Sequence, residues 1–285
     1  MIHTRNTSHE KNGGSSTKLA ALFCGIVFLL FCVVGAVKVF SLWQHGSFSG
    51  SQDFTLALVP EHFKKGQTLQ IFAFSPAENT LDIIQVQNAP PLALLGQSLK
   101  IPIDASIENV HLVSLDHVAA SKYLQMSIVH QYPRSQDLNI VDMVRLWLLA
   151  NSIPAHNIQR TDITVLPAPS QADMLSLDKV LSPLLQDQQI TQENLSVQII
   201  NASDTEGAGN RLARLLGNIG VNVISVKSAN ITQKNSTVSF FSKPSYTSDR
   251  ISHITGFSPL LQKRSNTLFD IIVTIGEDSK DTHVF

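Results

Sequence analysis

The segment 201–209 holds the residue types best suited to binding chemistry. Gly207 and Gly209 begin a predicted helix, and the free backbone N–H groups at a helix N-terminus can bind an anion. The segment lacks the lysine and the spacing of a P-loop, however, and Asp204 and Glu206 beside it would repel a phosphate. A tight turn that leads the chain into the helix is the simpler interpretation of the two glycines.

Carboxylates and histidines give no stronger signal for a metal. Asp204, Glu206 and Asp278 could meet at one sheet edge and bind a cation, although acidic loop residues are usually only solvated. The ten histidines are dispersed without a His-x-x-His or Cys–His spacing, and no Gly-x-Ser-x-Gly motif marks a serine nucleophile. We therefore predict no catalytic residue, no metal site and no cofactor, and we retain as candidate binding residues Asn201, Gly207, Gly209 and Asp278.

These residues are positioned by a strand–helix–strand unit that the sequence predicts at 197–226. A β-branched run at 197–200 predicts the first strand, and Val221–Val226 supplies the second. Between them, leucines recur at the helical period with arginines on the opposite side, and Gly217 and Gly220 are suited to ending the helix. So short a unit favours parallel strands joined by a right-handed crossover.

This unit resembles the C-terminal domain of LytR-type envelope proteins. The shared features are a strand ending in Asn-Ala-Ser at Asn201, a Gly-Ala-Gly helix start at Gly207 and an Arg-Leu-Leu-Gly-Asn-x-Gly helix end. That family domain closes on a strand followed by Gly-x-Asp, and residues 270–278 end here in Gly276-Glu277-Asp278. The resemblance covers 195–278 and implies an α/β domain of the cell envelope, without naming a catalytic group.

An apolar segment near the N-terminus predicts a membrane anchor. Residues 19–37 carry no charge and span about 28 Å as a helix, close to the hydrocarbon thickness of a bilayer. We predict a transmembrane helix at 19–41 that contacts the lipid bilayer, with a cleaved signal peptide as the alternative. Arg5, Lys11 and Lys18 precede it, so the positive-inside rule places the N-terminus in the cytoplasm and the C-terminal domains outside.

Composition narrows the class of partner. The formal net charge is −1, so bulk electrostatics give no support for nucleic-acid binding. Both cysteines, Cys24 and Cys32, lie in the predicted anchor, so the exported part can form no disulfide. That is ordinary for a bacterial surface protein.

The part before the LytR-type segment predicts a second α/β domain. Its predicted elements are strands at 54–59, 68–74, 81–86, 109–114 and 162–166, and helices at 118–129 and from 140 to about 150. Asp137 or Asn139 can cap the second helix, along which apolar residues recur at the helical period. We predict a tail at 1–18, a spacer at 42–53, this domain at 54–166, a linker at 167–194, the LytR-type domain at 195–278 and a tail at 279–285. Within the linker we predict a short amphipathic helix at 177–185, which Pro183 would kink, and a polar segment at 186–194.

The element order of this domain resembles the opening of the LytR-CpsA-Psr catalytic domain. The family transfers lipid-linked glycopolymers onto peptidoglycan with a metal ion, and it writes Arg-Ser-Asp-Thr where this chain has Lys65-Gly66-Gln67-Thr68. Its Ile-Pro-Arg-Asp corresponds here to a segment ending in Asn88 and Ala89. Gln67, Asn88 and Ala89 supply neither metal-binding carboxylate nor phosphate-binding cation, and one such group is worth about 3 kcal/mol in the transition state.

The sequence therefore predicts a bacterial, single-pass membrane protein with a degenerate LytR-CpsA-Psr-like domain and a LytR-type domain. Its predicted role is non-catalytic: binding or organising peptidoglycan, wall glycopolymer or partner proteins. The first alternative is a divergent transferase whose ligands are Asp82, Asp104, Arg134 and Arg145. The second is a regulator acting through the 18-residue cytoplasmic tail.

Overall fold

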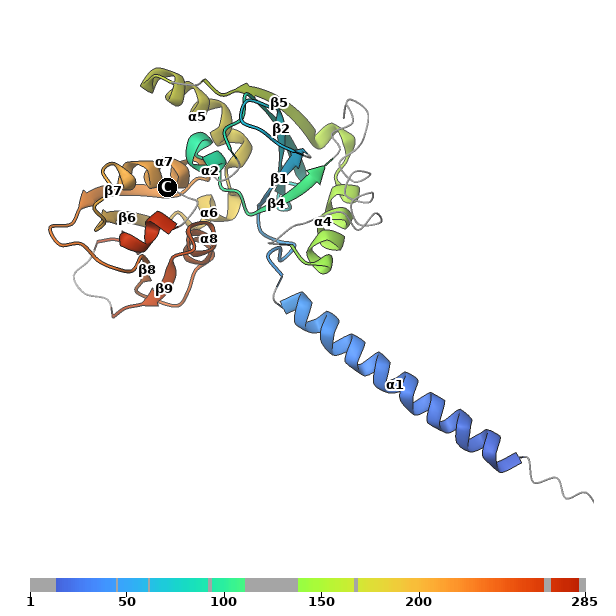
Figure 1. Ribbon diagram of the computed structural model, residues 1–285. Coiled ribbons are helices and arrows are strands. Elements are labelled where there is room, and N and C mark those ends of the chain that lie inside the picture. Colours follow the sequence, from blue (N-terminus) through green and yellow to red (C-terminus); the bar gives the residue numbers. More distant parts are fainter. Residues whose placement is uncertain are drawn as a thin grey trace, which may run out of the picture. The chain divides into compact units, whose positions relative to one another are not determined.

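The computed structural model describes residues 14–44, 46–60, 62–91, 94–110, 138–166, 169–263 and 268–281 (Figure 1). The predicted helix at 118–129, most of the predicted strand at 109–114 and Arg134 lie outside these residues. The chain divides into two compact units, Met1–Gly46 and Ser47–Phe285, which are considered separately below.

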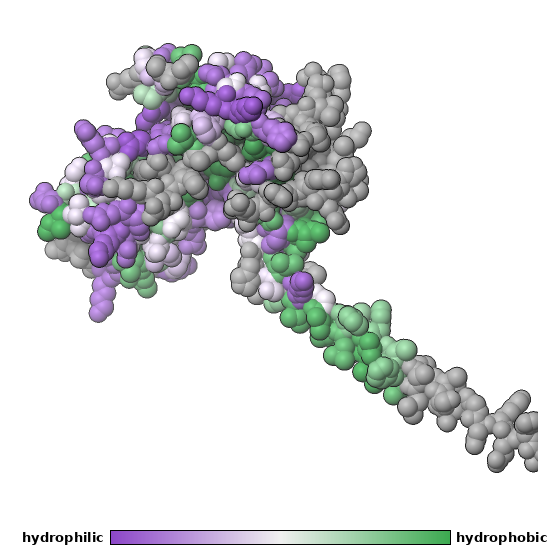
Figure 2. All heavy atoms as spheres, viewed as in Figure 1, coloured by the Kyte–Doolittle hydropathy of each residue, from purple (hydrophilic) through white to green (hydrophobic). Residues whose placement is uncertain are grey.

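The first unit contains one long apolar helix, α1 (Gly14–Gln44). Its segment Leu22–Trp43 has a mean hydropathy of 2.6, and none of it is buried by the rest of the protein. Apolar residues cover the visible side of this segment (Figure 2). The segment is long and apolar enough to cross a membrane, and a signal sequence would have the same properties.

The second unit is mixed α/β and contains two five-stranded sheets. The first sheet has the order β4-β1-β2-β3-β5 and is formed by β1 (Phe54–Pro60), β2 (Leu69–Ser75), β3 (Thr80–Gln87), β4 (Ala105–Val110) and β5 (Ile158–Thr164). Strands β1 to β3 are an antiparallel meander, while β4 and β5 add to its two edges in parallel. The first three predicted strands are confirmed, and the fifth, predicted at 162–166, begins at Ile158.

Both faces of this sheet are covered, which explains the nearly unbroken burial of β1 and β2. One face presents Leu56, Phe72 and Phe74 to the helix α4 (Ile140–Ser152). The other face presents Leu69 and Ile84 to a larger hydrophobic cluster that continues into the second sheet. Short segments on this side include α2 (Leu95–Leu99), and η2 (Ala155–Asn157) precedes β5.

Asn139 caps α4, as predicted: its side chain accepts hydrogen bonds from the backbone of Val141 and Asp142. The buried side of α4, however, is formed by Asp142, Met143, Leu146 and Ala150. The apolar residues whose period predicted the helix lie mainly on its outer side. Ile140, Val144 and Leu148 remain 63%, 37% and 55% exposed.

The second sheet has the order β7-β6-β10-β8-β9. Its strands are β6 (Ser196–Asn201), β7 (Asn222–Ser228), β8 (Thr237–Phe240), β9 (Ser258–Leu261) and β10 (Ile271–Ile275). Helix α7 (Ala208–Asn218) joins β6 to its parallel neighbour β7, and α8 (Tyr246–Thr255) joins the parallel pair β8 and β9. The predicted strand–helix–strand unit is therefore confirmed. A short helix, η3 (Glu277–Asp281), follows β10.

The segment between the sheets is helical, and its buried residues are Leu181, Leu185, Asp187 and Ile190. It contains α5 (Gln171–Leu185), which confirms the predicted amphipathic helix at 177–185, and α6 (Gln188–Glu193), which lies in the segment predicted as a polar linker. Asp187 caps α6, while Ile190, Leu181 and Leu185 enter the hydrophobic cluster shared by the two sheets. The polar composition of 186–194 hid this helix because only one of its side chains, Ile190, is an apolar anchor.

Two glycines of α7 allow a matched test of its packing. A Cβ at Gly209 would lie 2.8 Å from Cγ1 of Val226, whereas one at Gly217 meets nothing within 4 Å. We expect Gly209→Ala to destabilise the protein by about 1–3 kcal/mol through overpacking. Gly217→Ala should stabilise it by about 0.5–1 kcal/mol because alanine favours the helix. Chemical unfolding of the two variants in detergent measures both changes, and equal effects would contradict this account of Gly209.

Candidate functional site

The predicted binding residues at the end of β6 serve the local fold. Asn201 donates through Nδ2 to the carbonyl of Thr205 at 2.9 Å, and its Oδ1 accepts from the backbone and hydroxyl of Ser203. These bonds form the turn that leads into α7. Gly207 begins that helix at a φ of +71°, a left-handed conformation that favours glycine. Gly209 permits the close approach of α7 to β7.

Gly276 and Asp278 also have a structural role. A Cβ at Gly276 would lie 2.6 Å from the carbonyl carbon of Asn235, so the crossing backbone leaves no room for a side chain. The Asp278 carboxylate accepts hydrogen bonds from the backbone and hydroxyl of Ser236, at 2.8 and 2.5 Å for Oδ1. The Gly-x-Asp motif therefore holds the start of β8 against the end of β10.

No cation site forms from the acidic candidates. Within the described ranges, no group of three or more histidine, cysteine or acidic residues is arranged to hold a metal ion. Asp278 is engaged with Ser236. The four predicted binding residues thus belong to one end of the second sheet, and each has a structural reason for its identity.

The positions that the transferase resemblance singled out do come together. Gly66 donates its backbone N–H to the carbonyl of Ala89 at 2.9 Å, and Ala89 donates to the carbonyl of Gln67 at 3.0 Å. The Gln67 side chain accepts from the backbone of Lys64, and Asn88 donates to the carbonyl of Val165 at 2.6 Å. These bonds tie the loop before β2 to the segment after β3, and Gln67, Asn88 and Ala89 present no charged group there.

The charged residues of the alternative enzyme hypothesis have the following surroundings. Arg145 donates from Nη1 to the carbonyl of Phe48 at 2.6 Å, and Asp82 lies on β3. Asp104 is fully buried in an ion pair with Arg250, and Arg134 lies outside the described residues. Asp104 and Arg145 are thus engaged in structural contacts, while Asp82 lines the small cavity described below.

The Asp104–Arg250 pair is the principal electrostatic feature of the unit. Nη1 and Nη2 of Arg250 donate to the two carboxylate oxygens at 2.6 and 2.9 Å, and the side chains are 3% and 0% exposed. The backbone and hydroxyl of Thr55 also donate to Asp104. Burial alone would raise the pKa of Asp104, but the guanidinium holds it below its ordinary value. Sequence spacing gives no sign of this pair, whose members are 146 residues apart.

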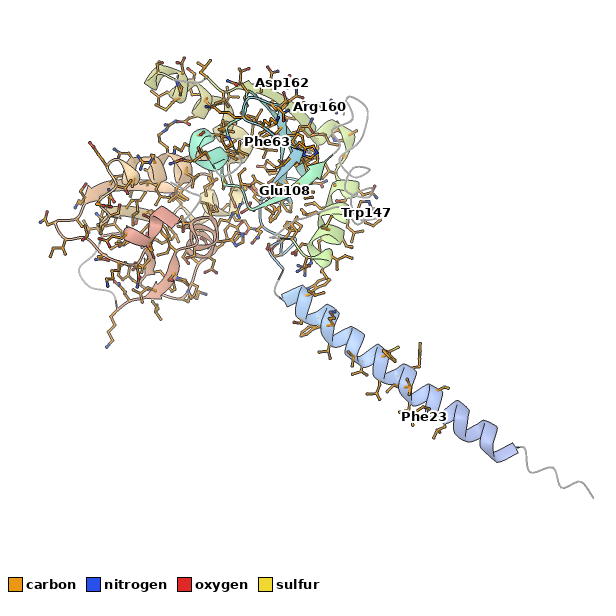
Figure 3. The ribbon with its side chains drawn as sticks, viewed as in Figure 1. Phe23, Phe63, Glu108, Trp147, Arg160 and Asp162 are labelled. Carbon is orange, nitrogen blue, oxygen red and sulfur yellow. The ribbon has the colours of Figure 1, made fainter. Side chains whose placement is uncertain are left out.

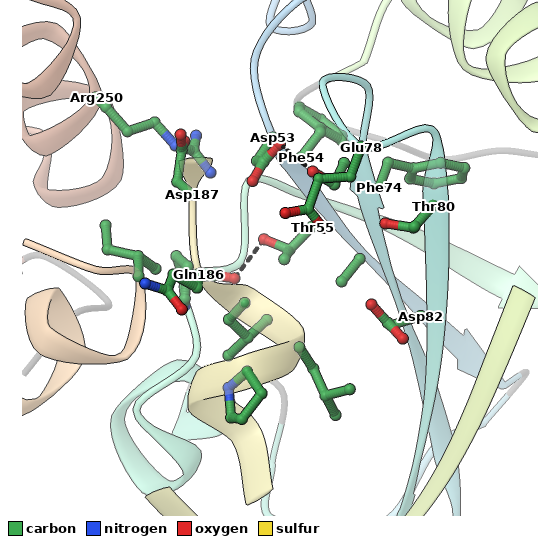
Figure 4. Close-up of a pocket in the computed structure, with 17 residues that line it drawn as sticks. Asp53, Phe54, Thr55, Phe74, Glu78, Thr80, Asp82, Gln186, Asp187 and Arg250 are labelled. Carbon is green, nitrogen blue, oxygen red and sulfur yellow. Dashed lines mark hydrogen bonds between the residues drawn. The ribbon is translucent and has the colours of Figure 1, made fainter. Parts of the chain in front are cut away.

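A small acidic cavity lies beside this pair (Figure 4). Its charged lining residues are Asp53, Glu78, Asp82, Asp187 and Arg250. The cavity measures about 30 Å³, enough for one or two water molecules but far too small for a sugar or a nucleotide. We therefore assign it no organic ligand. Asp53, Asp187 and Arg250 escaped the sequence analysis because no local motif contains them.

Burial perturbs two of these carboxyl groups. Burial and then the charge of Asp187 raise the pKa of Asp53 to about 7, although its Oδ1 accepts a hydrogen bond from Ser75. Burial and then the charge of Glu78 raise the pKa of Asp82 to about 6. The hydroxyl of Tyr246 donates to Asp187 at 2.7 Å, and burial with this bond raises the pKa of Tyr246.

A larger and more open groove lies on the first sheet, at the loop after β1. It measures about 310 Å³ and is lined by Val59, Pro60, His62, Phe63, Lys65, Pro91 and Glu108. Phe63 from this loop and Glu108 from β4 are labelled in Figure 3. The lining combines apolar side chains with one cation, Lys65, and one carboxylate, Glu108, and it adjoins the loop closed by Gln67 and Ala89.

Comparison with known protein families gives a match over the segment that forms the second sheet. A family model described as LytR cell envelope-related transcriptional attenuator matches residues 194–278. The match confirms the predicted resemblance of this segment to LytR-type C-terminal domains. The search of curated proteins and the search of solved structures gave no significant match.

The buried ion pair gives a test of stability. Arg250→Met leaves the Asp104 carboxylate buried without its cation, and we expect a loss of about 3–5 kcal/mol. The matched control is Arg214→Met, because the Arg214–Asp178 pair is 30% and 17% exposed and is worth about 1 kcal/mol or less. Urea unfolding in detergent measures both, and losses of the same size would contradict the role given to Arg250.

The raised pKa of Asp53 predicts that the stability of the protein depends on pH. Its folded pKa lies above the unfolded value, so its contribution to stability is greatest below about pH 4 and is lost as pH rises to about 7. Relative to Asp53→Asn, wild type should lose roughly 2 kcal/mol between pH 4 and pH 8. Unfolding free energies at several pH values test this. The control Asp162→Asn removes an exposed carboxylate, so its unfolding free energy should change with pH as that of wild type does. The same pH dependence in wild type and Asp53→Asn would overturn the prediction.

Proposed function

We propose that the protein is a membrane-anchored, extracytoplasmic protein of the bacterial cell envelope that binds or organises wall polymers or partner proteins without catalysis. The observation that carries the proposal is the LytR-type match at 194–278, which fits a cell-envelope protein. The apolar helix α1 supports retention in the membrane as a single span. On this proposal the N-terminus is cytoplasmic and Ser47–Phe285 lies outside.

The proposal assigns the first sheet to a degenerate LytR-CpsA-Psr-like domain. Support comes from the β1–β2–β3 meander and from the pairing of the loop before β2, which holds Gln67, with the segment after β3, which holds Asn88 and Ala89. A transferase needs carboxylates for its metal and cations for pyrophosphate at such a place. Two of the charged residues proposed as replacements, Asp104 and Arg145, are already engaged in structural contacts.

We assign polymer binding to the groove beside that loop. Its volume of about 310 Å³ falls at the lower end of the range of ligand sites. Phe63 offers an apolar surface on which a sugar or peptide can pack. Lys65 at the rim favours acidic groups, such as the carboxylates of peptidoglycan or the charges of a wall glycopolymer.

Sedimentation of the full chain in detergent with insoluble peptidoglycan, with and without attached glycopolymer, tests this function. We expect the protein in the pellet and about a five- to tenfold weaker association for Lys65→Glu, because the charge at the rim is reversed. The control Lys179→Glu makes the same change at an exposed site on α5. Absence of the protein from every pellet would count against the proposal.

A parallel assay addresses catalysis. The same preparation, with magnesium or manganese and a lipid-linked pyrophosphate substrate, should release no phosphate product above background. Turnover that is lost in Asp82→Asn would replace the binding function with the divergent transferase.

A further inference from the structure

The outer side of α4 is apolar from Ile140 to Leu148, and the polar residues Asn151 and Ser152 are exposed at the end of the helix. Ile140, Val144 and Leu148 follow one another at intervals of four, so they form a single stripe on the helix. Val141 and Trp147 flank the stripe and are partly buried. The charged residues of α4, Asp142 and Arg145, project elsewhere: Asp142 is fully buried and Arg145 contacts Phe48.

This pattern is unusual for a helix on the surface of a soluble unit. Such a helix normally buries one apolar stripe and presents polar residues to water. Here Met143, Leu146 and Ala150 already fill the inner side against the first sheet, and the outer side is apolar as well. A helix that is apolar on both sides suits a position between a protein core and a second apolar medium.

The start of α4 is tied to the residues that follow the apolar helix. The backbone N–H groups of Ser47 and Phe48 donate to the Asp142 carboxylate at 3.1 and 3.3 Å, and Arg145 donates to the carbonyl of Phe48. Helix α1 ends at Gln44, three residues before Ser47. Three residues span at most about 11 Å even when fully extended. If α1 spans a membrane, the covalent chain therefore keeps Ser47, which is bonded to the start of α4, within about 11 Å of the end of that span.

We infer that the stripe formed by Ile140, Val144 and Leu148, with Trp147 at its margin, is a membrane-contact surface that lies at the headgroup–acyl boundary of the outer leaflet. The inference rests on the proposed function, in which α1 stays in the bilayer. The occupant is a phospholipid surface, because the covalent chain brings α4 to one and the stripe carries no charge for a charged partner to recognise. The indole of Trp147 suits the same boundary.

The chain's two tryptophans, Trp43 and Trp147, make this contact measurable. In full-length Trp43→Phe, reconstituted in phosphatidylcholine–phosphatidylglycerol vesicles, Trp147 is the one remaining indole. Lipids brominated near the headgroup should quench about half of its fluorescence. Adding Val144→Lys and Leu148→Lys should reduce this quenching about threefold or more, because charged side chains avoid the acyl region.

The matched control carries its tryptophan away from α4. In Trp43→Phe/Trp147→Phe/Ile224→Trp the indole replaces Ile224 of β7, which is 59% exposed, close to the 55% of Leu148. Brominated lipids should leave about nine tenths of its fluorescence. Equal quenching at both positions, or none at Trp147, would overturn the membrane contact.

Vesicle flotation separates this inference from the proposed function. If the chain fails to float with the vesicles, the anchor itself is wrong. If it floats and resists alkaline extraction while Trp147 stays unquenched, the anchor stands and the contact surface does not. A third outcome is that Trp147 is not quenched and that the Leu148→Cys variant forms a cross-linked dimer. This outcome would assign the stripe to a second copy of the chain instead.

Discussion

The guanidinium of Arg250 and the carboxylate of Asp104 meet between α8 and the start of β4, with both side chains almost completely removed from water. Such a pair tolerates little movement, because either charge left alone in that place would be strongly unfavourable. It therefore fixes the position of the second sheet's helix against the first sheet. The shared hydrophobic cluster, the helix α6 and the acidic cavity all lie around this fixed point.

Polar side chains elsewhere in the unit also form hydrogen bonds within the protein. Asn201 completes a turn, Asp278 clamps Ser236, and Asp142 holds Ser47 and Phe48. These polar groups are used to hold backbone segments in place. The groove at the loop after β1 is lined by apolar side chains together with His62, Lys65 and Glu108.

Local signals in the sequence predicted much of the fold. The 197–226 unit was accessible because a β-branched run, a glycine start and a leucine stripe all agree within one short segment. The buried side of α4 could not be predicted from the sequence. Apolar residues occur on both sides of that helix, so their spacing does not show which side faces the core. The Asp104–Arg250 pair and the raised pKa of Asp53 depend on contacts between distant segments, which composition and spacing do not encode.

The helix α6 lies before the matched LytR-type segment but packs against it. The family match begins at residue 194, yet Ile190 of α6 fills the core beside α7, and Asp187 accepts the hydroxyl of Tyr246. On the other side, Asn218 donates to the carbonyl of Lys100. The matched segment is thus shorter than the set of residues that packs around it. A fragment cut at residue 194 would lose the Ile190 side chain, the Asp187 acceptor and the Lys100 carbonyl.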